Sequence, residues 1–420
     1  MTELIENKEI EERVILVGIS TGDGEDAEAS LKELAELVKT AGAVSIDQII
    51  QKREAAHPAT YLGKGKMEEV KWRIWETEAT GIVCDDELSP AQLRNLEEAL
   101  ETKVMDRTMV ILDIFASQAT TREGKIQVEL AQLRFRAARL VGIHHSLSRL
   151  GGGIGTRGPG ETKLEVDRRR IHQRIGQLKS DLEEVKRHRE VARQQRTRNH
   201  MPVAAIVGYT NAGKSTLLNQ LTGAGIFAED KLFATLDPTT RKLALPDGQE
   251  ILLTDTVGFI RKLPHHLVEA FKSTLEEAKY SDIILHVVDV SNPQMEMQMH
   301  VVYETLRELE IGDKVMVTVF NKMDRLEENV ILRDFSSDYQ VKISAKSGEG
   351  LTALAEVLET ILRSRRVYLE KVFSYQEAGK IQQVRKSGQL LEEEYIQDGI
   401  WVKAYIPAEL YASFMQKIQD

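Results

Sequence analysis

The sequence predicts an α/β protein built on parallel sheets, with a helical hairpin in its middle and a small α+β module at its end. Two regions, 14–117 and 202–365, alternate short apolar runs with segments of helical spacing, which is typical of parallel strands joined by crossover helices. Between these regions, apolar residues recur three and four apart. A chain of 420 residues is long enough for two to four domains at roughly 100–200 residues each. We expect domains over 1–117, 118–200, 201–365 and 366–420.

Composition favours a water-soluble chain, with 42% hydrophobic and 29% charged residues. No stretch approaches the ~20 uninterrupted apolar residues that a membrane-spanning helix needs. The acidic N-terminus lacks the apolar core of a signal peptide. The single cysteine, Cys84, excludes an internal disulfide framework and a Cys-rich metal site, and its setting in GIVCDDE predicts a buried strand. We therefore expect a cytoplasmic protein without a stable membrane span, and a monomer.

The first region shows its elements in sequence order. Strands are predicted over 14–19, 43–50 and 81–85, and helices over 27–39 and 67–77. Ser89 followed by Pro90 predicts a further helix, because serine caps helix N-termini and proline suits the first helical position. The short Gly/Lys segment Leu62–Lys66 is weak as a phosphate-binding motif. It is predicted to be a turn, and contact with nucleotide or RNA is the alternative.

The middle region predicts two helices that pack against each other. Apolar residues follow a heptad-like pattern on each side of a glycine-rich segment. The first set is Ile126, Leu130, Leu133, Ala137 and Leu140, and the second is Ile171, Ile175, Leu178, Leu182, Val185 and Ala192. The segment between them, GGGIGTRGPG (151–160), cannot be helical, since glycine is costly there and proline breaks helices. This arrangement predicts an antiparallel hairpin.

Charge is distributed unevenly, and the hairpin carries most of the positive charge. The formal net charge is −10, yet Arg122–His200 contains 19 Lys and Arg against nine Asp and Glu. Because a partner feels the local field more than the total charge, this segment could bind a phosphate backbone. A solvated helical face is the alternative, and for a run of charges it is the more common outcome.

The region 202–365 contains five apolar runs, VAAIVG, EILLTDT, IILHVVDV, VMVTVFN and VKISA, separated by helical segments. In the tail after Val367, EEEYIQ and IWVKAYI flank Asp398-Gly399, which predicts a β-hairpin. The stretch 407–418 predicts a closing helix.

The first of the five runs ends in a phosphate-binding motif. GYTNAGKS fits G-x-x-x-x-G-K-[ST], and it follows a predicted strand and precedes a predicted helix, as the motif requires. The glycines allow backbone N–H groups to surround phosphate oxygens, and the helix N-terminus adds its dipole. Lys214 is predicted to contact the β- and γ-phosphates, and Ser215 to ligate Mg²⁺. The predicted contacts in this loop are Gly208, Tyr209, Thr210, Asn211, Ala212, Gly213, Lys214, Ser215 and Thr216.

Three more segments follow in the order expected of a GTP site. Asp255 can reach the Mg²⁺ shell and the Gly258 N–H can bind the γ-phosphate. Asp324 can accept two hydrogen bonds from guanine, which adenine cannot supply. The predicted contacts here are Asp255, Thr256, Val257, Gly258, Asn321, Lys322, Met323, Asp324, Ser344, Ala345 and Lys346. The order of these motifs resembles that of the translation-factor-type GTPases.

The chain also resembles one family within these GTPases, HflX. The residues that carry this resemblance are GYTNAGKST, LFATLDPTTR, DTVGFI, NKMD and the loop GGGIGTRGPGETKLEVDRRR, with YLGKGK and CDDELSP in the first region. FATLDPT is also similar to Obg-type GTPases. The resemblance implies that Phe233, Ala234, Thr235, Leu236 and Asp237 form switch I. It implies that Thr235 reaches Mg²⁺, so that Lys214, Thr235 and Gly258 serve catalysis; Thr239 is the rival hydroxyl.

The resemblance also implies a partner. HflX proteins bind the large ribosomal subunit, and the family's activity is the dissociation or rescue of idle or stalled ribosomes. By this resemblance the hairpin contacts ribosomal RNA through Gly151, Gly152, Gly153, Arg157, Arg168, Arg169 and Arg170. Two alternatives remain open: a GTPase of large-subunit assembly, and a signalling switch with a protein partner.

Two positions leave the chemistry open. Phe259 stands where Ras-like enzymes have the glutamine that orients the attacking water. Its ring cannot hold a water by hydrogen bonds, so either a partner completes the site, or Phe259 belongs to the core and His265 or His266 acts. Asn211 resembles the asparagine of K⁺-dependent GTPases of the TrmE type, although a loop-capping role is an equal alternative.

Overall fold

The computed structural model describes residues 11–22, 26–147, 163–198, 201–223, 232–233, 235–246, 248–262, 275–311, 314–326 and 331–415. The chain divides into two compact units. The first comprises Met1–Val185, Glu229–Asp237 and Arg261–Ser273. The second comprises Lys186–Ala228, Pro238–Ile260 and Thr274–Asp420. The boundaries predicted at 117, 200 and 365 stay a prediction.

The first unit contains a parallel sheet, as the alternating pattern predicted. Its strand order is β2-β1-β3-β4, and every neighbouring pair is parallel. The strands are β1 (Arg13–Ser20), β2 (Val44–Lys52), β3 (Gly81–Cys84) and β4 (Lys103–Asp106). Cys84 is buried in this sheet, as predicted. The sequence analysis missed β4, whose sequence KVMD contains only two apolar residues between two charged ones.

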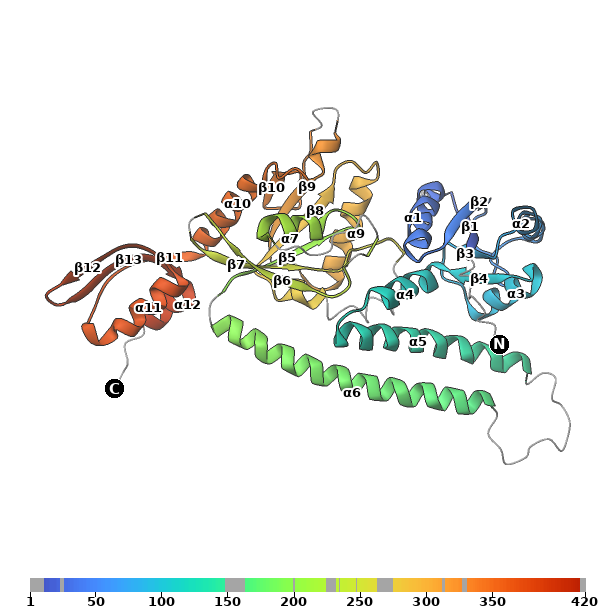
Figure 1. The fold of residues 1–420 in the computed structure, drawn as a ribbon, viewed down its shortest axis with the longest axis horizontal. Helices are drawn as coiled ribbons and strands as arrows, with labels where there is room; N and C mark the ends of the chain where they lie inside the picture. The colour runs from blue at the N-terminus through green and yellow to red at the C-terminus, as the bar shows by residue number, and fades with distance from the viewer. Residues whose placement is uncertain are drawn as a thin grey trace, which may run out of the picture. The chain divides into compact units, whose positions relative to one another are not determined.

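Four helices accompany this sheet: α1 (Ala27–Thr40), α2 (Lys64–Thr77), α3 (Pro90–Leu100) and α4 (Arg107–Gln118) (Figure 1). The predicted cap of α3 is confirmed, because the Ser89 side chain accepts from the Gln92 N–H and the Gln92 side chain returns to the Ser89 backbone. The predicted loop Leu62–Lys66 is wrong at its end. Helix α2 begins at Lys64, with Gly63 as its N-cap residue, so Lys64–Lys66 form the first helical turn.

The hairpin is confirmed as two long helices, α5 (Arg122–Leu147) and α6 (Lys163–Arg198). Residues of both predicted seams form one core, in which Ile126, Leu130, Ile175 and Leu178 are buried. Leu140 of the first seam does not belong to this core. Partly buried seam residues extend this core in both helices: Leu133, Ala137, Ile171, Leu182 and Val185. The loop 151–160 lies outside the described residues.

The second unit contains a six-stranded sheet of order β10-β9-β8-β5-β7-β6. The five predicted runs form β5 (Val203–Gly208), β7 (Glu250–Asp255), β8 (Ile283–Asp289), β9 (Val315–Asn321) and β10 (Tyr339–Lys342), all parallel. The sixth strand, β6 (Thr239–Ala244), pairs antiparallel with β7 at the sheet edge. It was not predicted, because its TTRKLA sequence is mostly polar and one face remains exposed. The helices are α7 (Lys214–Thr222), α9 (Met295–Glu308) and α10 (Leu351–Ser364).

The tail is an α+β module, as predicted. Its antiparallel sheet has the order β11-β13-β12, with β11 (Arg366–Phe373), β12 (Gln389–Ile396) and β13 (Gly399–Pro407). Helices α11 (Ala378–Ser387) and α12 (Ala408–Met415) lie on one side of this sheet (Figure 1). The predicted hairpin at Asp398-Gly399 joins β12 to β13.

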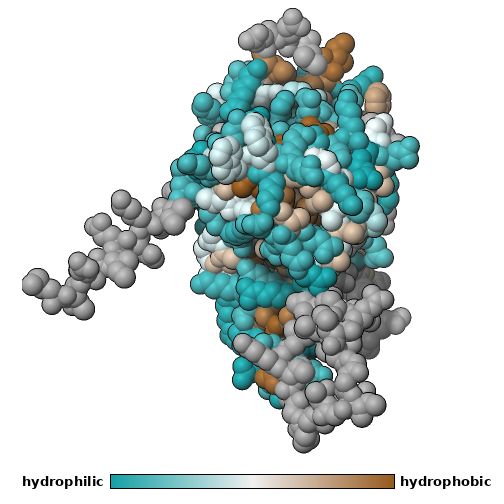
Figure 2. All heavy atoms as spheres, turned by 90° about the vertical axis from the view of Figure 1, so that its right-hand side faces the viewer, coloured by the Kyte–Doolittle hydropathy of each residue, from teal (hydrophilic) through white to brown (hydrophobic). Residues whose placement is uncertain are grey.

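The surface seen in Figure 2 is mainly hydrophilic, with small separate apolar patches. Among the described helices, none has both the length and the apolar character that crossing a membrane requires.

Candidate nucleotide site

The loop between β5 and α7 requires glycine at both of its ends. Gly208 has φ +154° and Gly213 has φ +95°, values that side-chain-bearing residues rarely adopt. A Cβ on Gly208 would lie 2.3 Å from the Val287 carbonyl oxygen, and one on Gly213 would lie 2.3 Å from Asn321 Nδ2. The backbone is therefore packed too closely at both positions for a side chain.

Lys214 begins α7 and is buried, with 6% of its surface exposed. Its Nζ donates to the carbonyl oxygens of Gly208 at 3.2 Å and Tyr209 at 2.8 Å. Burial lowers the pKa of Lys214 to about 8, and the nearby Lys322 acts in the same direction, against Asp255. A buried ammonium group held by the loop's own carbonyls is prepared to interact with an anion.

Ser215 and Asp255, predicted for the Mg²⁺ shell, lie together. The Ser215 hydroxyl donates to Asp255 Oδ2 at 2.7 Å. Asp255 ends β7 and is 1% exposed. Hydroxyl and carboxylate oxygens are ligands that Mg²⁺ prefers, so this donor set fits the ion. Gly258 is equally close to the loop, since a Cβ there would lie 2.7 Å from Thr210 Cα and 2.9 Å from Lys214 Nζ.

Phe259 is part of the core. Its side chain is 2% exposed, its N–H donates to the Gly208 carbonyl, and its own carbonyl accepts from the Thr210 N–H. The residue forms a parallel bridge with Tyr209, which is also buried. Phe259 is therefore a core residue, and the group that takes the place of the glutamine stays a prediction. His265 and His266 lie outside the described residues.

The opposite end of the site is organised by Asn321, which ends β9. Its Nδ2 donates to the Ala212 carbonyl at 2.8 Å, and its Oδ1 accepts from the Ala345 N–H at 2.9 Å. One side chain thus joins the phosphate loop to the segment after β10. Asp324 is exposed and accepts from the buried Ser344 hydroxyl at 2.6 Å, a hydrogen bond that lowers the Asp324 pKa.

The structure adds Asp289, a residue that the sequence analysis missed. Asp289 is the last residue of β8, and it pairs with Lys322 at 2.7 Å. Lys322, which was predicted, has φ +65°. Met323 is half-buried and Lys346 is exposed. The signal for Asp289 was its place at the end of an apolar run, where polar residues of parallel sheets face ligands.

The segment predicted to form switch I belongs to the first unit. Thr235, Leu236 and Asp237 lie in that unit, whereas the phosphate loop lies in the second. The Asp237 carboxylate accepts from the N–H groups of Thr120 at 3.0 Å and Thr121 at 2.8 Å. Burial alone would raise the Asp237 pKa, but these hydrogen bonds and those from the two hydroxyls lower it.

The remaining predicted switch I residues are Phe233 and Ala234. Phe233 is buried with its ring edge-on to Phe115, and Ala234 lies outside the described residues. The rival hydroxyl, Thr239, lies in β6 directly opposite Asp255 in the second unit.

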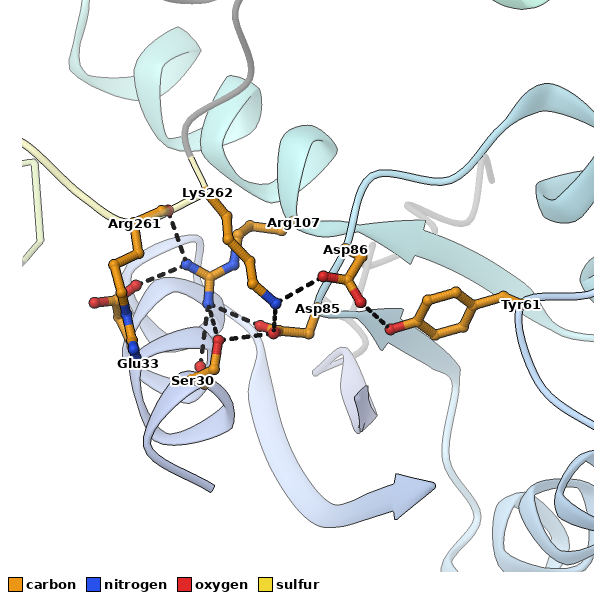
Figure 3. A network of polar contacts seen from close by, with 8 residues as sticks. All are labelled: Ser30, Glu33, Tyr61, Asp85, Asp86, Arg107, Arg261 and Lys262. Atoms are coloured by element: carbon orange, nitrogen blue, oxygen red, sulfur yellow. Dashed lines mark hydrogen bonds and ion pairs between the residues drawn. The ribbon is translucent and has the colours of Figure 1, made fainter. Parts of the chain in front are cut away.

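A polar network surrounds the segment that directly follows DTVGFI (Figure 3). Lys262 Nζ lies 2.8 Å from Asp85 Oδ2 and 2.7 Å from Asp86 Oδ1. The buried Arg107 pairs with Asp85 at 2.8 Å and donates to the Arg261 carbonyl at 3.2 Å. Asp85 and Asp86 follow β3, so they lie at the carboxyl end of the parallel sheet, where α/β proteins place functional residues.

This network gives the two sequence motifs of the first region a common location. Tyr61, from YLGKGK, donates through its hydroxyl to Asp86 at 2.6 Å, and Asp85 and Asp86 come from CDDELSP. Burial alone would raise the Asp85 pKa, but Arg107 and Lys262 lower it, so Asp85 carries its charge inside the network. Sequence reasoning did not find these pairings, since they join residues far apart in the chain.

Two other groups of predicted residues have different outcomes. Arg168, Arg169 and Arg170 lie exposed in α6. Gly151, Gly152, Gly153 and Arg157 lie outside the described residues.

Asn211 has φ +60° and is exposed. Within the residues the structure describes, its side chain makes no hydrogen bond, so the predicted loop-capping bonds are not found there.

A glycine-bounded loop between strand and helix, a buried lysine, a strand-end aspartate beside a serine, and an Asp324–Ser344 pair define a P-loop protein of the GTPase class. Comparison with known families agrees. Residues 203–322 match the family described as 50S ribosome-binding GTPase. Residues 28–116 match GTP-binding GTPase N-terminal, and 118–196 match GTP-binding GTPase Middle Region.

The chain belongs to the HflX family of GTPases, and it is a GTP hydrolase. It is 78% identical over 413 residues to a protein named GTPase HflX from Lacrimispora saccharolytica, covering 98% of both chains. It is 46% identical to GTPase HflX of Escherichia coli strain K12, covering 83% of this chain and 82% of that protein. A solved structure titled SsGBP and GDP complex is 25% identical with a TM-score of 0.47, covering 83% of this chain and 98% of that one.

Proposed function

We propose that this GTPase binds the ribosome through its large subunit and uses GTP binding and hydrolysis to dissociate or rescue idle or stalled ribosomes. The observation that carries the proposal is the match of residues 203–322 to the 50S ribosome-binding GTPase family. It is supported by the hairpin, whose α6 exposes Arg168, Arg169 and Arg170. Exposed arginines suit a phosphate backbone, because binding there releases counterions.

We propose the following roles for the site residues. Lys214 would bind the β- and γ-phosphates, and the Gly258 N–H would bind the γ-phosphate. Asp324 would pair with guanine N1–H and N2–H₂, held in place by Ser344. Ser215 and Asp255, with Thr235 from switch I, would hold Mg²⁺, which supplies charge neutralisation of the phosphates when bound.

Asn211 supports a further cofactor proposal. An exposed asparagine whose side chain lacks a hydrogen bond in the described structure can offer its carbonyl oxygen to K⁺ beside the phosphates. Turnover in matched K⁺ and Na⁺ buffers tests this assignment, and equal rates would end it.

Phe259 leads us to expect slow GTP hydrolysis by the free enzyme and faster hydrolysis with the ribosome. A buried phenyl group cannot orient the attacking water, so the free enzyme is expected to hydrolyse GTP slowly. Completion of such a site by a partner is worth as much as ~10³–10⁵ in rate in related GTPases. We expect ribosomes, and the large subunit alone, to stimulate turnover strongly.

The test measures GTP hydrolysis and ribosome integrity together. Hydrolysis is followed with no addition, with large subunits, and with small subunits as the control. Light scattering of intact ribosomes then follows their dissociation with GTP or with a non-hydrolysable analogue. Fast hydrolysis that is indifferent to large subunits would contradict the proposal. Binding to assembly intermediates in preference to intact ribosomes would favour the assembly role.

A further inference from the structure

A cavity of about 540 Å³ lies between α4, α5 and α6, and none of the candidate nucleotide-site residues lines it. This volume falls within the roughly 300–1,000 Å³ of small-ligand pockets. On α5 it is lined by Gln132, Phe135, Arg136 and Arg139, which share one face because they lie three and four residues apart. Leu140 and Ile171, from the predicted seams of α5 and α6, also line it, so the cavity adjoins the hairpin core.

The cavity contains a flat guanidinium surface, that of Arg139, which is held in place. The Arg139 guanidinium lies over the Phe135 ring, 3.8 Å from its centroid. Its Nη2 pairs with the buried Asp106 at 2.6 Å, and its Nη1 lies 3.2 Å from the Met109 sulfur. With its orientation fixed in this way, the guanidinium plane loses little freedom when a ligand stacks against it. Arginine planes and aromatic rings are the surfaces on which unstacked nucleobases stack.

Polar groups surround this surface in an arrangement that suits one nucleotide. Leu112 provides an apolar wall, and the Asp113 carboxylate makes no hydrogen bond within the described residues. A carboxylate of this kind can accept from the N–H groups of a base edge. Arg136, from α5, and Arg170, from α6, are both exposed and line the same cavity. They can bind phosphate groups on either side of an inserted base.

We propose that this cavity binds one unstacked nucleotide of single-stranded RNA, with the base on Arg139 and the flanking phosphates at Arg136 and Arg170. The inference rests on the proposed function, because it names the RNA contact through which the hairpin engages the ribosome. RNA is favoured over a free nucleotide because the cavity lies on the segment that carries 19 Lys and Arg against nine Asp and Glu. A continuous backbone profits from that field along its length.

The experiment uses the full chain and a ten-nucleotide single-stranded RNA with 2-aminopurine at its centre. Binding is measured by anisotropy across a salt series, and insertion of the base by 2-aminopurine fluorescence. Arg136→Gln with Arg170→Gln removes the phosphate contacts, and Gln132→Trp fills the cavity from the surface of α5. The control pair, Lys179→Gln with Arg187→Gln, removes two exposed charges of α6 that do not line the cavity.

We expect the arginine pair to weaken RNA binding at least tenfold more than the control pair, and to reduce the salt slope by about 1.4, from two contacts at about 0.7 each. Gln132→Trp is expected to abolish the fluorescence change while circular dichroism stays unchanged. Equal affinities of the cavity variants and the control pair would overturn the assignment. So would competition by free AMP at the concentration at which the oligonucleotide binds.

The same variants distinguish this inference from the proposed function. If the parent chain co-sediments with large subunits and the cavity variants do so equally, only the cavity assignment fails. If the parent chain does not bind ribosomes, the proposed function fails, whatever the oligonucleotide shows.

Discussion

The Ser344 hydroxyl donates to Asp324 Oδ1 at 2.6 Å, so a buried residue after β10 fixes the orientation of an exposed carboxylate after β9. This hydrogen bond lowers the Asp324 pKa. The carboxylate therefore stays an acceptor over the physiological pH range, which is the state that guanine requires. Ser344 is 0% exposed and cannot easily turn away.

Guanine specificity is predicted to depend on this carboxylate. Asp324→Asn keeps the volume but replaces an acceptor with a donor, which opposes the guanine N–H groups. Loss of such paired hydrogen bonds costs about 1–3 kcal/mol. We expect weaker GTP binding and a gain for xanthosine triphosphate, measured by competition. Ser344→Ala should show a smaller loss without the gain, and unchanged GTP affinity in Asp324→Asn would refute the role.

The metal role of Ser215 is testable by titration. Ser215→Ala removes the hydroxyl that lies 2.7 Å from Asp255, and we expect a higher Mg²⁺ concentration for half-maximal hydrolysis. Ser215→Thr retains a hydroxyl and is the conservative control. An identical Mg²⁺ dependence in Ser215→Ala and the parent would remove this residue from the metal shell.

The exposed arginines of α6 should determine the salt dependence of ribosome binding. Changing Arg168, Arg169 and Arg170 together to Ala should weaken co-sedimentation with large subunits and flatten its salt slope, since fewer counterions are released. The control changes three exposed lysines outside the hairpin to Ala: Lys32, Lys39 and Lys52. GTP affinity should change in neither variant. Intact ribosome binding in the arginine variant would assign the hairpin a scaffold role.

His286 predicts a specific loss of stability in acid. The ring is 1% exposed, lies edge-on to Tyr303, and burial lowers its pKa to about 4. Because the folded pKa lies below the ordinary value of about 6.5, protonation favours the unfolded chain. The contribution of the neutral His286 ring to the free energy of unfolding is therefore full above pH 6.5 and is lost as the pH falls toward 4. At pH 5 the free energy of unfolding is expected to be lower by about 2 kcal/mol for this reason.

Urea unfolding at pH 7 and pH 5 measures this effect. His286→Leu cannot titrate, so its loss between the two pH values should be smaller than that of the parent by about this amount. His300→Leu, at an exposed position of α9, is the matched control and should behave as the parent. Equal acid sensitivity of His286→Leu and the parent would show that the ring does not titrate as described.

Lys262 and Asp86 should contribute jointly to the free energy of unfolding, because they form an ion pair. Lys262→Ala leaves Asp85 with Arg107 but removes both contacts of the ammonium group. Because these groups are only partly exposed, we expect a loss of about 1–3 kcal/mol in thermal or chemical unfolding. The double-mutant cycle with Asp86→Ala isolates the pair. Strict additivity of the two changes would mean that the pair contributes nothing.

Local sequence pattern predicted much of the fold and the order of the nucleotide motifs, for a physical reason. The P-loop, its strand and its helix are contiguous, so glycine requirements and period show them directly. Strand β6 was missed because it is polar and exists only by pairing with β7. The Asp289–Lys322 and Lys262–Asp85 pairs were missed because the partners are remote in the chain and brought together by tertiary packing.

Asn321 gives the nucleotide site a property that concerns time more than affinity. Its side chain contacts the Ala212 carbonyl on the phosphate side and the Ala345 N–H on the base side. The Asn321 side chain therefore links the two halves of the site, and we expect them to open together. Product release from such a site is a single event with one lifetime, so GDP should depart in a single exponential phase. Asn321→Ala removes both hydrogen bonds, so we expect GDP to dissociate in separate phases and with a shorter residence time.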